Sequence, residues 1–175
     1  MSDPSSQPPG RRVGIGFLVV AWVLLIGLLT LWFGDWEEQQ NNPNATPHSQ
    51  RVDGAVEVVL SPNRAGHYVA NGRINDTQVT FLLDTGATQV AVPEAVARDA
   101  GLQKGYQGWV QTANGRAKAW STRIDRLQLG DIVLHDVQAT ITPGMGLDEV
   151  LLGMSALGQV DFSQTGGKLK LRQHL

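Results

Sequence analysis

The sequence predicts an all-β domain over residues 52–175, preceded by one membrane-spanning helix. Short alternating runs of apolar and polar residues recur about every ten residues in this segment, with turn residues between them, which is the pattern of an all-β fold. The helix is predicted from a long uncharged stretch near the N-terminus. The total length of 175 residues leaves room for one globular domain behind that helix.

Residues 13–33 form the uncharged stretch. About 21 residues at ~1.5 Å per residue cross a ~30 Å hydrocarbon core, so we expect a transmembrane helix. Arg11 and Arg12 precede it and acidic residues follow it, which places residues 1–12 in the cytoplasm and the domain on the other side of the membrane. A cleaved signal peptide is the alternative, but its apolar part is typically ~7–15 residues long and no small-residue cleavage site follows Phe33.

Residues 34–51 are rich in Gln, Asn, Pro, Ser and Glu. A segment of this composition buries too little apolar surface to offset the entropy that it loses on ordering. We therefore expect a flexible linker between the helix and the domain.

The charge and cysteine content of the chain exclude several function classes. Residues 52–175 contain 11 Lys and Arg against 12 Asp and Glu, a formal net charge of −1 without a basic stripe, so nucleic acid is not an expected partner. The absence of Cys excludes a disulfide framework and a thiol nucleophile. The four histidines lack the spacing of zinc ligands, and we predict neither a metal nor a cofactor.

The candidate catalytic motif is Asp84-Thr85-Gly86-Ala87, directly behind the apolar run 79–83. A strand that ends in these residues delivers a carboxylate into a cleft, while the backbone and the hydroxyl of the turn fix its orientation. Two such carboxylates a few ångströms apart share one proton, so one acts as base toward water and the other as acid toward a peptide carbonyl. The sequence holds one Asp-Thr-Gly, so a working site needs two chains.

A hairpin that follows this motif has the pattern of a flap. Asn114-Gly115 is typical of a two-residue type I′ turn, and this register pairs Trp109 with Trp120 across the strands. Such a pair would stiffen a projecting hairpin. Its tip follows Asp84 at a distance of about 25 residues or more in the chain and would close over a substrate. The alternative is that the two tryptophans only cover an edge of the core.

Local patterns predict the remaining elements of the domain. The expected elements are a hairpin of residues 67–74 and 78–83 that turns at 75–76, a strand over 89–92, a helix from Pro93 to Gly101, a hairpin centred on Gly130-Asp131, strands over 137–141 and 168–172, and a strand that runs into a short helix over 150–157.

Together these motifs resemble the retropepsin-like aspartic proteases of clan AA, in particular their bacterial membrane-anchored single-domain branch. The likeness rests on residues 72–88 around the Asp-Thr-Gly loop, on 112–115 in the flap, and on Leu-Leu-Gly at 151–153 before the C-terminal helix. It covers essentially all of residues 52–175. The resemblance implies a closed, β-barrel-like protomer with a flap hairpin and a short C-terminal helix.

The resemblance also implies roles for the residues of the loop. Asp84 would be the catalytic carboxylate, one from each protomer of a homodimer. Thr85 would bond across the two-fold axis, Gly86 would give the backbone access to the carboxylate, and Ala87 would line the floor.

The resemblance further implies how the substrate and the second protomer bind. The flap residues would close on the backbone of a peptide or protein substrate: Thr112, Ala113, Asn114 and Gly115. In the viral relatives the chain termini interleave in a dimer sheet, to which Leu169 and Leu171 would contribute here.

The resulting functional hypothesis is a membrane-anchored aspartic endopeptidase that hydrolyses peptide bonds. Residues 13–33 would hold it in the lipid bilayer of the inner membrane, with residues 52–175 in the periplasm. One alternative is a non-catalytic peptide-binding or scaffold module of the same fold. Another is a peptidase that processes only itself or one membrane partner, which differs in substrate rather than in chemistry.

Overall fold

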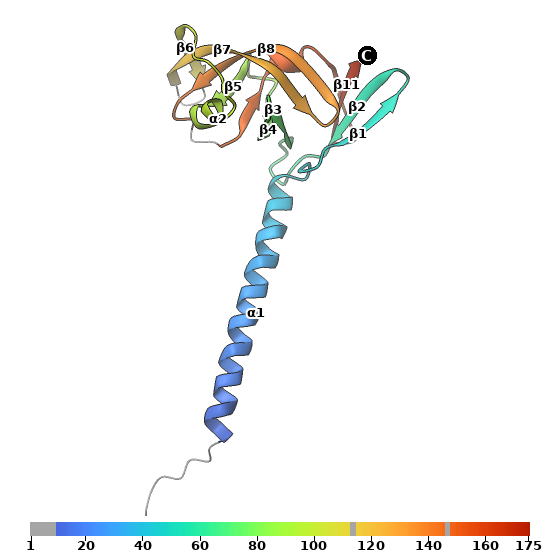
Figure 1. The fold of residues 1–175 in the computed structure, drawn as a ribbon. Coiled ribbons are helices and arrows are strands. Elements are labelled where there is room, and N and C mark those ends of the chain that lie inside the picture. The colour runs from blue at the N-terminus through green and yellow to red at the C-terminus, as the bar shows by residue number, and fades with distance from the viewer. Residues whose placement is uncertain (1–9, 113–114, 146–147) are drawn as a thin grey trace, which may run out of the picture. The chain divides into compact units, whose positions relative to one another are not determined.

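The structure is a computed structural model and describes residues 10–112, 115–145 and 148–175 (Figure 1). The chain divides into two compact units, Met1–Gln39 and Gln40–Leu175.

The first unit contains most of helix α1, Gly10–Asn41. Large apolar side chains along this helix are exposed within the chain, among them Phe17 and Leu31. From Gly16 onward the helix is long and apolar enough to cross a membrane, judged by length and composition. It therefore provides a candidate membrane span that overlaps the predicted span of residues 13–33 from Gly16 onward.

The second unit is built almost entirely of strands. Its elements are β1 (His48–Val52), β2 (Ala55–Leu60), β3 (Val69–Ile74), β4 (Thr77–Leu83), β5 (Val90–Pro93), α2 (Glu94–Asp99), β6 (Gln107–Thr112), β7 (Gly115–Leu129), β8 (Ile132–Thr142), β9 (Val150–Leu152), α3 (Met154–Leu157), β10 (Asp161–Thr165) and β11 (Lys168–His174).

Six of these strands close into a barrel. The order along the larger sheet is β3-β4-β9-β5-β8-β7-β6, and β3 also pairs with β7, which joins the two ends of the six-stranded part. β6 lies outside this ring and forms a hairpin with β7 (Figure 1). The prediction of an all-β fold with a closed barrel and a short C-terminal helix is confirmed.

The alternating pattern of each strand places its apolar residues inside the barrel. Phe81 of β4, Ile74 of β3, Val92 of β5 and Ile124 of β7 are fully buried. The predicted turns connect them: Ile74 pairs with Thr77 across the turn at residues 75–76. The core therefore lies directly behind the strand that leads to Asp84.

The hairpin centred on residues 130–131 and the helix after β5 also agree with the sequence. Leu129 pairs with Ile132 across the turn, where Gly130 has a φ of 58°, a conformation that glycine adopts without strain. Pro93 stands immediately before α2, and Gly101 follows it with a φ of 69°.

The turn predicted for the flap hairpin is one residue too late in the chain, so the predicted strand pairing is wrong by two residues. Thr112 pairs with Gly115, which leaves residues 113–114 as the connection; these two lie outside the described residues. Trp109 consequently pairs with Lys118, whose Nζ lies 5.7 Å from the Trp109 ring centroid, and it does not pair with Trp120. A shift of two residues keeps each side chain on its face of the hairpin but changes its partner: Trp120 lies opposite Gln107, so the two tryptophans are not directly paired.

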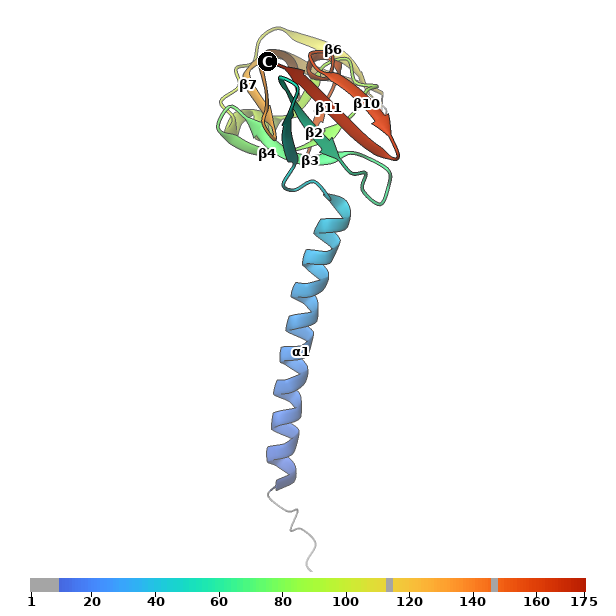
Figure 2. The ribbon, with the colours of Figure 1, turned by 90° about the vertical axis from the view of Figure 1, so that its right-hand side faces the viewer.

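A second sheet lies beside the barrel, with strand order β1-β2-β11-β10 (Figure 2). Leu171 pairs with Val58, Leu169 pairs with Leu60, and all four are buried in the core of the same chain. Within the single chain β11 therefore lies between β2 and β10, and the expectation that Leu169 and Leu171 contribute to a sheet between two chains stays a prediction.

Residues 34–51 contain more regular structure than their composition indicates. Helix α1 continues to Asn41 and β1 begins at His48. Between them Asn44 is only 5% exposed: its Nδ2 donates to the carbonyl oxygens of Ser61 (2.8 Å) and Val69 (2.7 Å), and its Oδ1 accepts from the Ser61 N–H (2.8 Å). These specific hydrogen bonds order a segment that has little apolar surface to bury.

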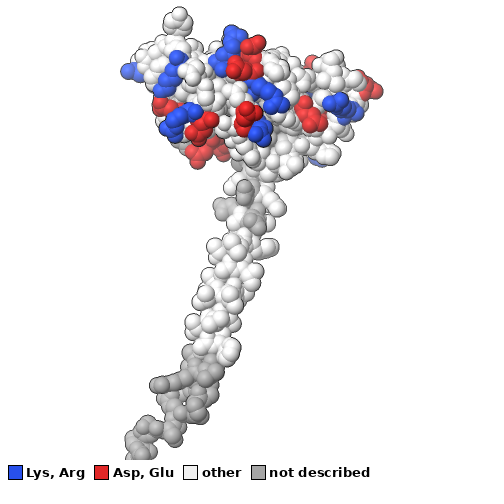
Figure 3. All heavy atoms as spheres, in the orientation of Figure 1, with Lys and Arg blue, Asp and Glu red and all other residues white. Residues whose placement is uncertain are grey.

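Charged side chains are mixed by sign on the surface. On the face of the domain seen in Figure 3, Lys and Arg lie among Asp and Glu rather than apart from them. The face in view therefore presents no extended patch of one sign.

Candidate active site

Asp84 is held where the strand before it runs beside β9. Leu83 pairs with Leu152 in a parallel ladder, and the next backbone N–H, that of Asp84, donates to the Leu152 carbonyl oxygen at 3.2 Å. The last β4 residues thus have their direction fixed by the buried strand β9. Asp84 is half-buried at the point where the chain leaves the barrel, and the next residue, Thr85, is exposed.

The turn orients the carboxylate through its own backbone. The Gly86 N–H donates to Asp84 Oδ1 at 2.8 Å, and the Ala87 N–H donates to the Asp84 carbonyl oxygen at 3.2 Å. A Cβ atom on residue 86 would lie 3.1 Å from Oδ1, tighter than an ordinary carbon contact. Glycine therefore leaves room for the N–H to approach the carboxylate.

Gly153 allows the start of α3 to pack onto the loop. A Cβ atom at this position would lie 2.4 Å from the Gln89 carbonyl oxygen and 2.7 Å from the Ala87 carbonyl oxygen. The two following N–H groups, those of Met154 and Ser155, donate to Ala87 (2.8 Å) and to Thr88 (3.0 Å). The residues that follow Leu-Leu-Gly thus hold the Asp84 loop in place through two backbone hydrogen bonds.

Ser155 ties three segments together through its hydroxyl. Its Oγ donates to the Gln138 carbonyl oxygen on β8 at 2.7 Å and accepts from the Val90 N–H at the start of β5 at 3.0 Å. The sequence predicts only that Ser155 begins a helix, and it does not predict these two hydrogen bonds. A Ser one residue inside a short helix carries no local signal of partners 17 and 65 residues away.

A cleft of about 690 Å³ opens on one side of Asp84. Small side chains line much of it, which leaves room for the larger side chains of a bound peptide. Its lining comes from the Asp84 loop, the flap hairpin, the end of β8 and the barrel: Asp84, Gly86, Ala87, Thr88, Gln89, Ala91, Val110, Gln111, Arg116, Ala117, Thr140, Thr142, Pro143, Gly144, Met145 and Leu151.

The predicted flap lies along this cleft, and only part of it is described. Val110 and Ala117, which pair across the hairpin, both line the cleft. Of the predicted flap residues, Ala113 and Asn114 lie outside the described residues, and Thr112 and Gly115 are described as the paired strand ends. The structure therefore brings the base of the flap hairpin and Asp84 to one cleft.

The charged residues of the cleft are Asp84 and Arg116. The sequence indicates no role for Arg116, because its position in the hairpin carries no signal that its side chain reaches the cleft. Among the described residues, no three His, Cys, Asp or Glu side chains are placed to hold a metal ion.

One chain brings one motif carboxylate to this cleft. A carboxylate fixed by a backbone N–H accepts a proton from water, but attack on an amide also requires an acid that protonates the carbonyl oxygen. A second carboxylate, sharing a proton with the first, would supply that acid. The geometry of one chain therefore fits one half of a two-carboxylate site.

Comparisons with known proteins agree with this arrangement. The model of a protein family described as "gag-polyprotein putative aspartyl protease" matches residues 70–159, slightly more than half of the chain. This span runs from β3 to the residues after α3 and contains the Asp84 loop, the cleft and the flap.

Two sequence relatives come from bacteria. The chain is 32% identical over 115 residues to an uncharacterized protein in the cobV 5′ region of Sinorhizobium sp, a match that covers 64% of this chain and 49% of that protein. It is 30% identical over 105 residues to an uncharacterized protein of Rickettsia prowazekii (strain Madrid E), covering 58% of this chain and 44% of that protein. The matches thus span about half the length of these relatives.

A solved structure matches more of the chain. The crystal structure of a retropepsin-like aspartic protease from Rickettsia conorii superposes with a TM-score of 0.60 at 26% sequence identity. The match covers 73% of this chain and 96% of that one.

Proposed function

Because the chain belongs to the retropepsin-like family of aspartic proteases, we propose that it is an aspartic endopeptidase whose two catalytic carboxylates are the Asp84 side chains of a homodimer. The observation that supports this proposal most is the position of Asp84: it follows a buried strand, is fixed by the Gly86 N–H, and stands in a cleft of peptide size. Peptide hydrolysis is the reaction for which this arrangement is suited.

In the proposed reaction the two Asp84 side chains share one proton. The ionised one takes a proton from a water molecule, whose oxygen attacks the carbonyl carbon of the scissile peptide bond. The protonated one gives its proton to the carbonyl oxygen, which forms a tetrahedral intermediate. Collapse of this intermediate breaks the C–N bond: the amine takes the proton that the first carboxylate received from water, and a hydroxyl of the intermediate returns a proton to the second carboxylate. No covalent bond to the enzyme forms.

Thr85, Gly86 and Ala87 support this reaction by holding the loop. The Gly86 N–H holds one oxygen of the Asp84 carboxyl group in place by a hydrogen bond. The exposed Thr85 is free of any side-chain role in the barrel core, so we assign it to the contact between the two loops, as the family resemblance implies.

The flap is proposed to bind the substrate backbone. Four residues would close over the peptide and form main-chain hydrogen bonds with it, as neighbouring strands do in a sheet: Thr112, Ala113, Asn114 and Gly115. The cleft residues Val110 and Ala117 at the base of the hairpin would contact its side chains.

We further propose that α1 anchors the enzyme in the inner membrane, with the N-terminus in the cytoplasm and the protease domain in the periplasm. The apolar composition of the helix and the two arginines before it support this orientation. Substrates would then be proteins or peptides outside the cytoplasm.

The test uses the full-length chain in detergent micelles with a diverse mixture of peptides, analysed by mass spectrometry. The wild type is expected to cleave peptides, and Asp84→Asn, which keeps the shape of the side chain, is expected to cleave none. Asp131→Asn, at an exposed turn, is the matched control and should cleave as the wild type does. Equal cleavage by Asp84→Asn would rule out the mechanism, and binding without cleavage by the wild type would favour the scaffold module.

A further inference from the structure

The substrate cleft contains one cation that the proposed reaction does not use. Arg116 and Asp84 are the charged residues in its lining. The Arg116 side chain is exposed and forms no ion pair with another described residue. A guanidinium group stays charged at physiological pH, and its planar set of N–H donors fits a carboxylate through two parallel hydrogen bonds. Arg116 can therefore bind a carboxylate group of a molecule in the cleft.

Arg116 lies next to the flap residues that are proposed to bind the substrate backbone. It is the first residue after residues 112–115 and pairs with Gln111 across the hairpin. Val110 and Ala117 form the next pair away from the tip, and both also line the cleft. A peptide whose backbone is held by residues 112–115 would thus lie within reach of Arg116, which is long enough to contact a side chain of that peptide.

The flap hairpin and the residues on either side of it are basic. Residues 100–124 contain four Lys and Arg residues and no Asp or Glu. Two of the four, Lys104 and Arg123, have carboxylate partners outside this stretch, whereas Arg116 has none among the described residues. A carboxylate that approaches the flap is therefore attracted to Arg116 and meets no acidic residue of the hairpin.

The charges of the proposed dimer site do not cancel. Two Asp84 side chains that share one proton carry one negative charge between them, whereas two Arg116 side chains carry two positive charges. The residues that line the site thus leave it with one positive charge. Complementary charge favours a bound peptide that is acidic over one that is neutral or basic.

We propose that Arg116 binds the carboxylate of an Asp or Glu side chain in the substrate, so that the enzyme selects peptide segments with an acidic residue close to the cleaved bond. This inference rests on the proposed function, because it names the substrates of the same site. The two-fold symmetry of the proposed dimer supplies one Arg116 on each side of the paired carboxylates. An acidic residue on either side of the cleaved bond would therefore find a partner.

The first test measures binding without hydrolysis. The probes are fluorescent ten-residue peptides of Ala, Val, Thr and Ser that contain one Glu, moved through successive positions, and a matched set in which Gln replaces this Glu. They are titrated against full-length Asp84→Asn in detergent micelles, and fluorescence anisotropy gives the dissociation constants. At one position or more, the Glu peptide is expected to bind about tenfold more tightly than the Gln peptide. Equal dissociation constants throughout, or no measurable binding of any Glu peptide, would overturn the proposal.

A charge exchange separates a contact with the substrate from a structural role. In the same Asp84→Asn background, Arg116→Glu is expected to reverse the preference and to bind a peptide with Lys at the favoured position more tightly than the Glu peptide. Arg116→Gln should bind the Glu and Gln peptides equally. Its thermal unfolding should match that of the parent chain, because the Arg116 side chain is exposed.

The matched control is Lys118→Gln, two residues further along β7. Lys118 is exposed and basic like Arg116, but it does not line the cleft. This variant should keep the preference for the Glu peptide. An equal loss of preference in Arg116→Gln and Lys118→Gln would show a general attraction to the basic hairpin and would contradict the proposed site.

The outcomes separate this proposal from the proposed function. Preferred binding of Glu peptides through Arg116, combined with no hydrolysis by the wild type, would retain the acidic-peptide site and reject the protease. Hydrolysis by the wild type, combined with equal kcat/KM for the Glu and Gln peptides, would retain the protease and reject the site.

Discussion

At the scale of single residues, Gly86 determines how the carboxylate is presented. Its N–H lies 2.8 Å from Asp84 Oδ1, and the position where a Cβ would stand lies 3.1 Å from the same oxygen. Any other residue type would force the carboxylate or the turn to move by a few tenths of an ångström. A shift of this size matters more for a reaction than for folding, because the turn is exposed.

We therefore expect Gly86→Ala to lower kcat/KM by roughly 10- to 100-fold while the melting temperature changes little. Steady-state hydrolysis of a cleaved peptide and thermal unfolding measure the two effects. Gly108→Ala is the matched control, because a Cβ there meets open space and the backbone is not left-handed. Full activity in Gly86→Ala would mean that the close N–H contact has no role in presenting Asp84.

Ser155 acts on stability rather than on chemistry. Ser155→Ala removes the acceptor of the Val90 N–H and the donor to the Gln138 carbonyl oxygen, which leaves two backbone groups without this partner. We expect a loss of about 1–3 kcal/mol in the free energy of unfolding, measured by denaturant titration. Ser163→Ala, at an exposed side chain, should change it by less than about 0.5 kcal/mol. Equal values for the two variants would show that the bridge contributes nothing.

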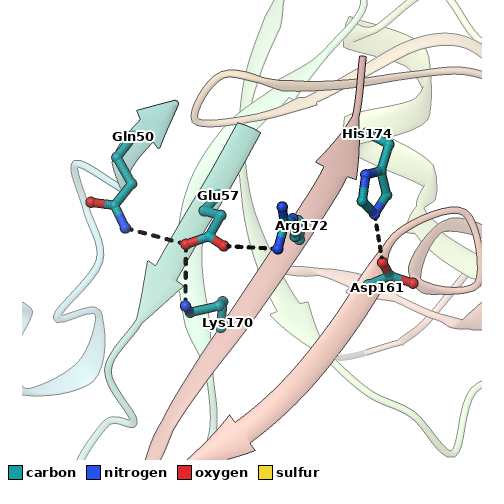
Figure 4. A network of polar contacts seen from close by, with 6 residues as sticks. All are labelled: Gln50, Glu57, Asp161, Lys170, Arg172 and His174. Carbon is teal, nitrogen blue, oxygen red and sulfur yellow. Dashed lines mark hydrogen bonds and ion pairs between the residues drawn. The ribbon is translucent and has the colours of Figure 1, made fainter. Parts of the chain in front are cut away.

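At the scale of elements, the four-stranded sheet contains one buried carboxylate among the described residues, that of Glu57. The Glu57 side chain is 6% exposed and accepts from Lys170 Nζ at 3.2 Å, with Arg172 at 3.7 Å and Gln50 at 3.3 Å (Figure 4). The hydrogen bond from Lys170 is the main cause that lowers the pKa of Glu57 below its ordinary value of 4.5, and burial opposes it. The pair joins β2 to β11, on which β10 depends.

This lowered pKa makes the sheet sensitive to acid. The folded chain binds fewer protons at Glu57 than the unfolded chain does, so the stabilisation is present above pH 4.5 and is lost as the pH falls through the lower folded pKa. We expect the melting temperature to fall across this range in the wild type. The Glu57→Gln variant lacks this carboxyl group, so the part of the fall in melting temperature that Glu57 causes should be absent from it.

The matched control for the acid experiment is Glu94→Gln, which removes an exposed ion pair with Lys104. This variant should retain the pH dependence of the wild type, because an exposed pair contributes little to stability. Identical pH profiles of Glu57→Gln and the wild type would show that Glu57 does not link acid to unfolding.

At the scale of the whole molecule, the sequence predicts best what its local patterns encode. The Asp84 loop, the turn at residues 75–76 and the strand-to-helix element at 150–157 each combine a few neighbouring residues with a known conformational preference. The barrel follows because these elements have few other ways to bury their apolar faces.

The features that the sequence did not predict depend on partners far away in the chain. β2 pairs with β11 more than a hundred residues later, and no local pattern in either strand identifies the other as its partner. Asn44 was placed in a flexible linker because its composition is polar, although its side chain is buried by hydrogen bonds. The predicted flap turn is one residue too late because Asn114-Gly115 matches a common turn, and turn preference alone does not decide which residues pair.

The central claim is that each chain supplies one half of the catalytic site. It is tested most directly by mixing the full-length wild type with Asp84→Asn at constant total concentration, under conditions where both are dimeric and exchange freely, and measuring peptide hydrolysis. If both carboxylates are required, activity follows the square of the wild-type fraction, and an equal mixture retains about a quarter of the wild-type rate. A linear dependence, with about half of the rate remaining, would show that each chain works alone and would contradict the account.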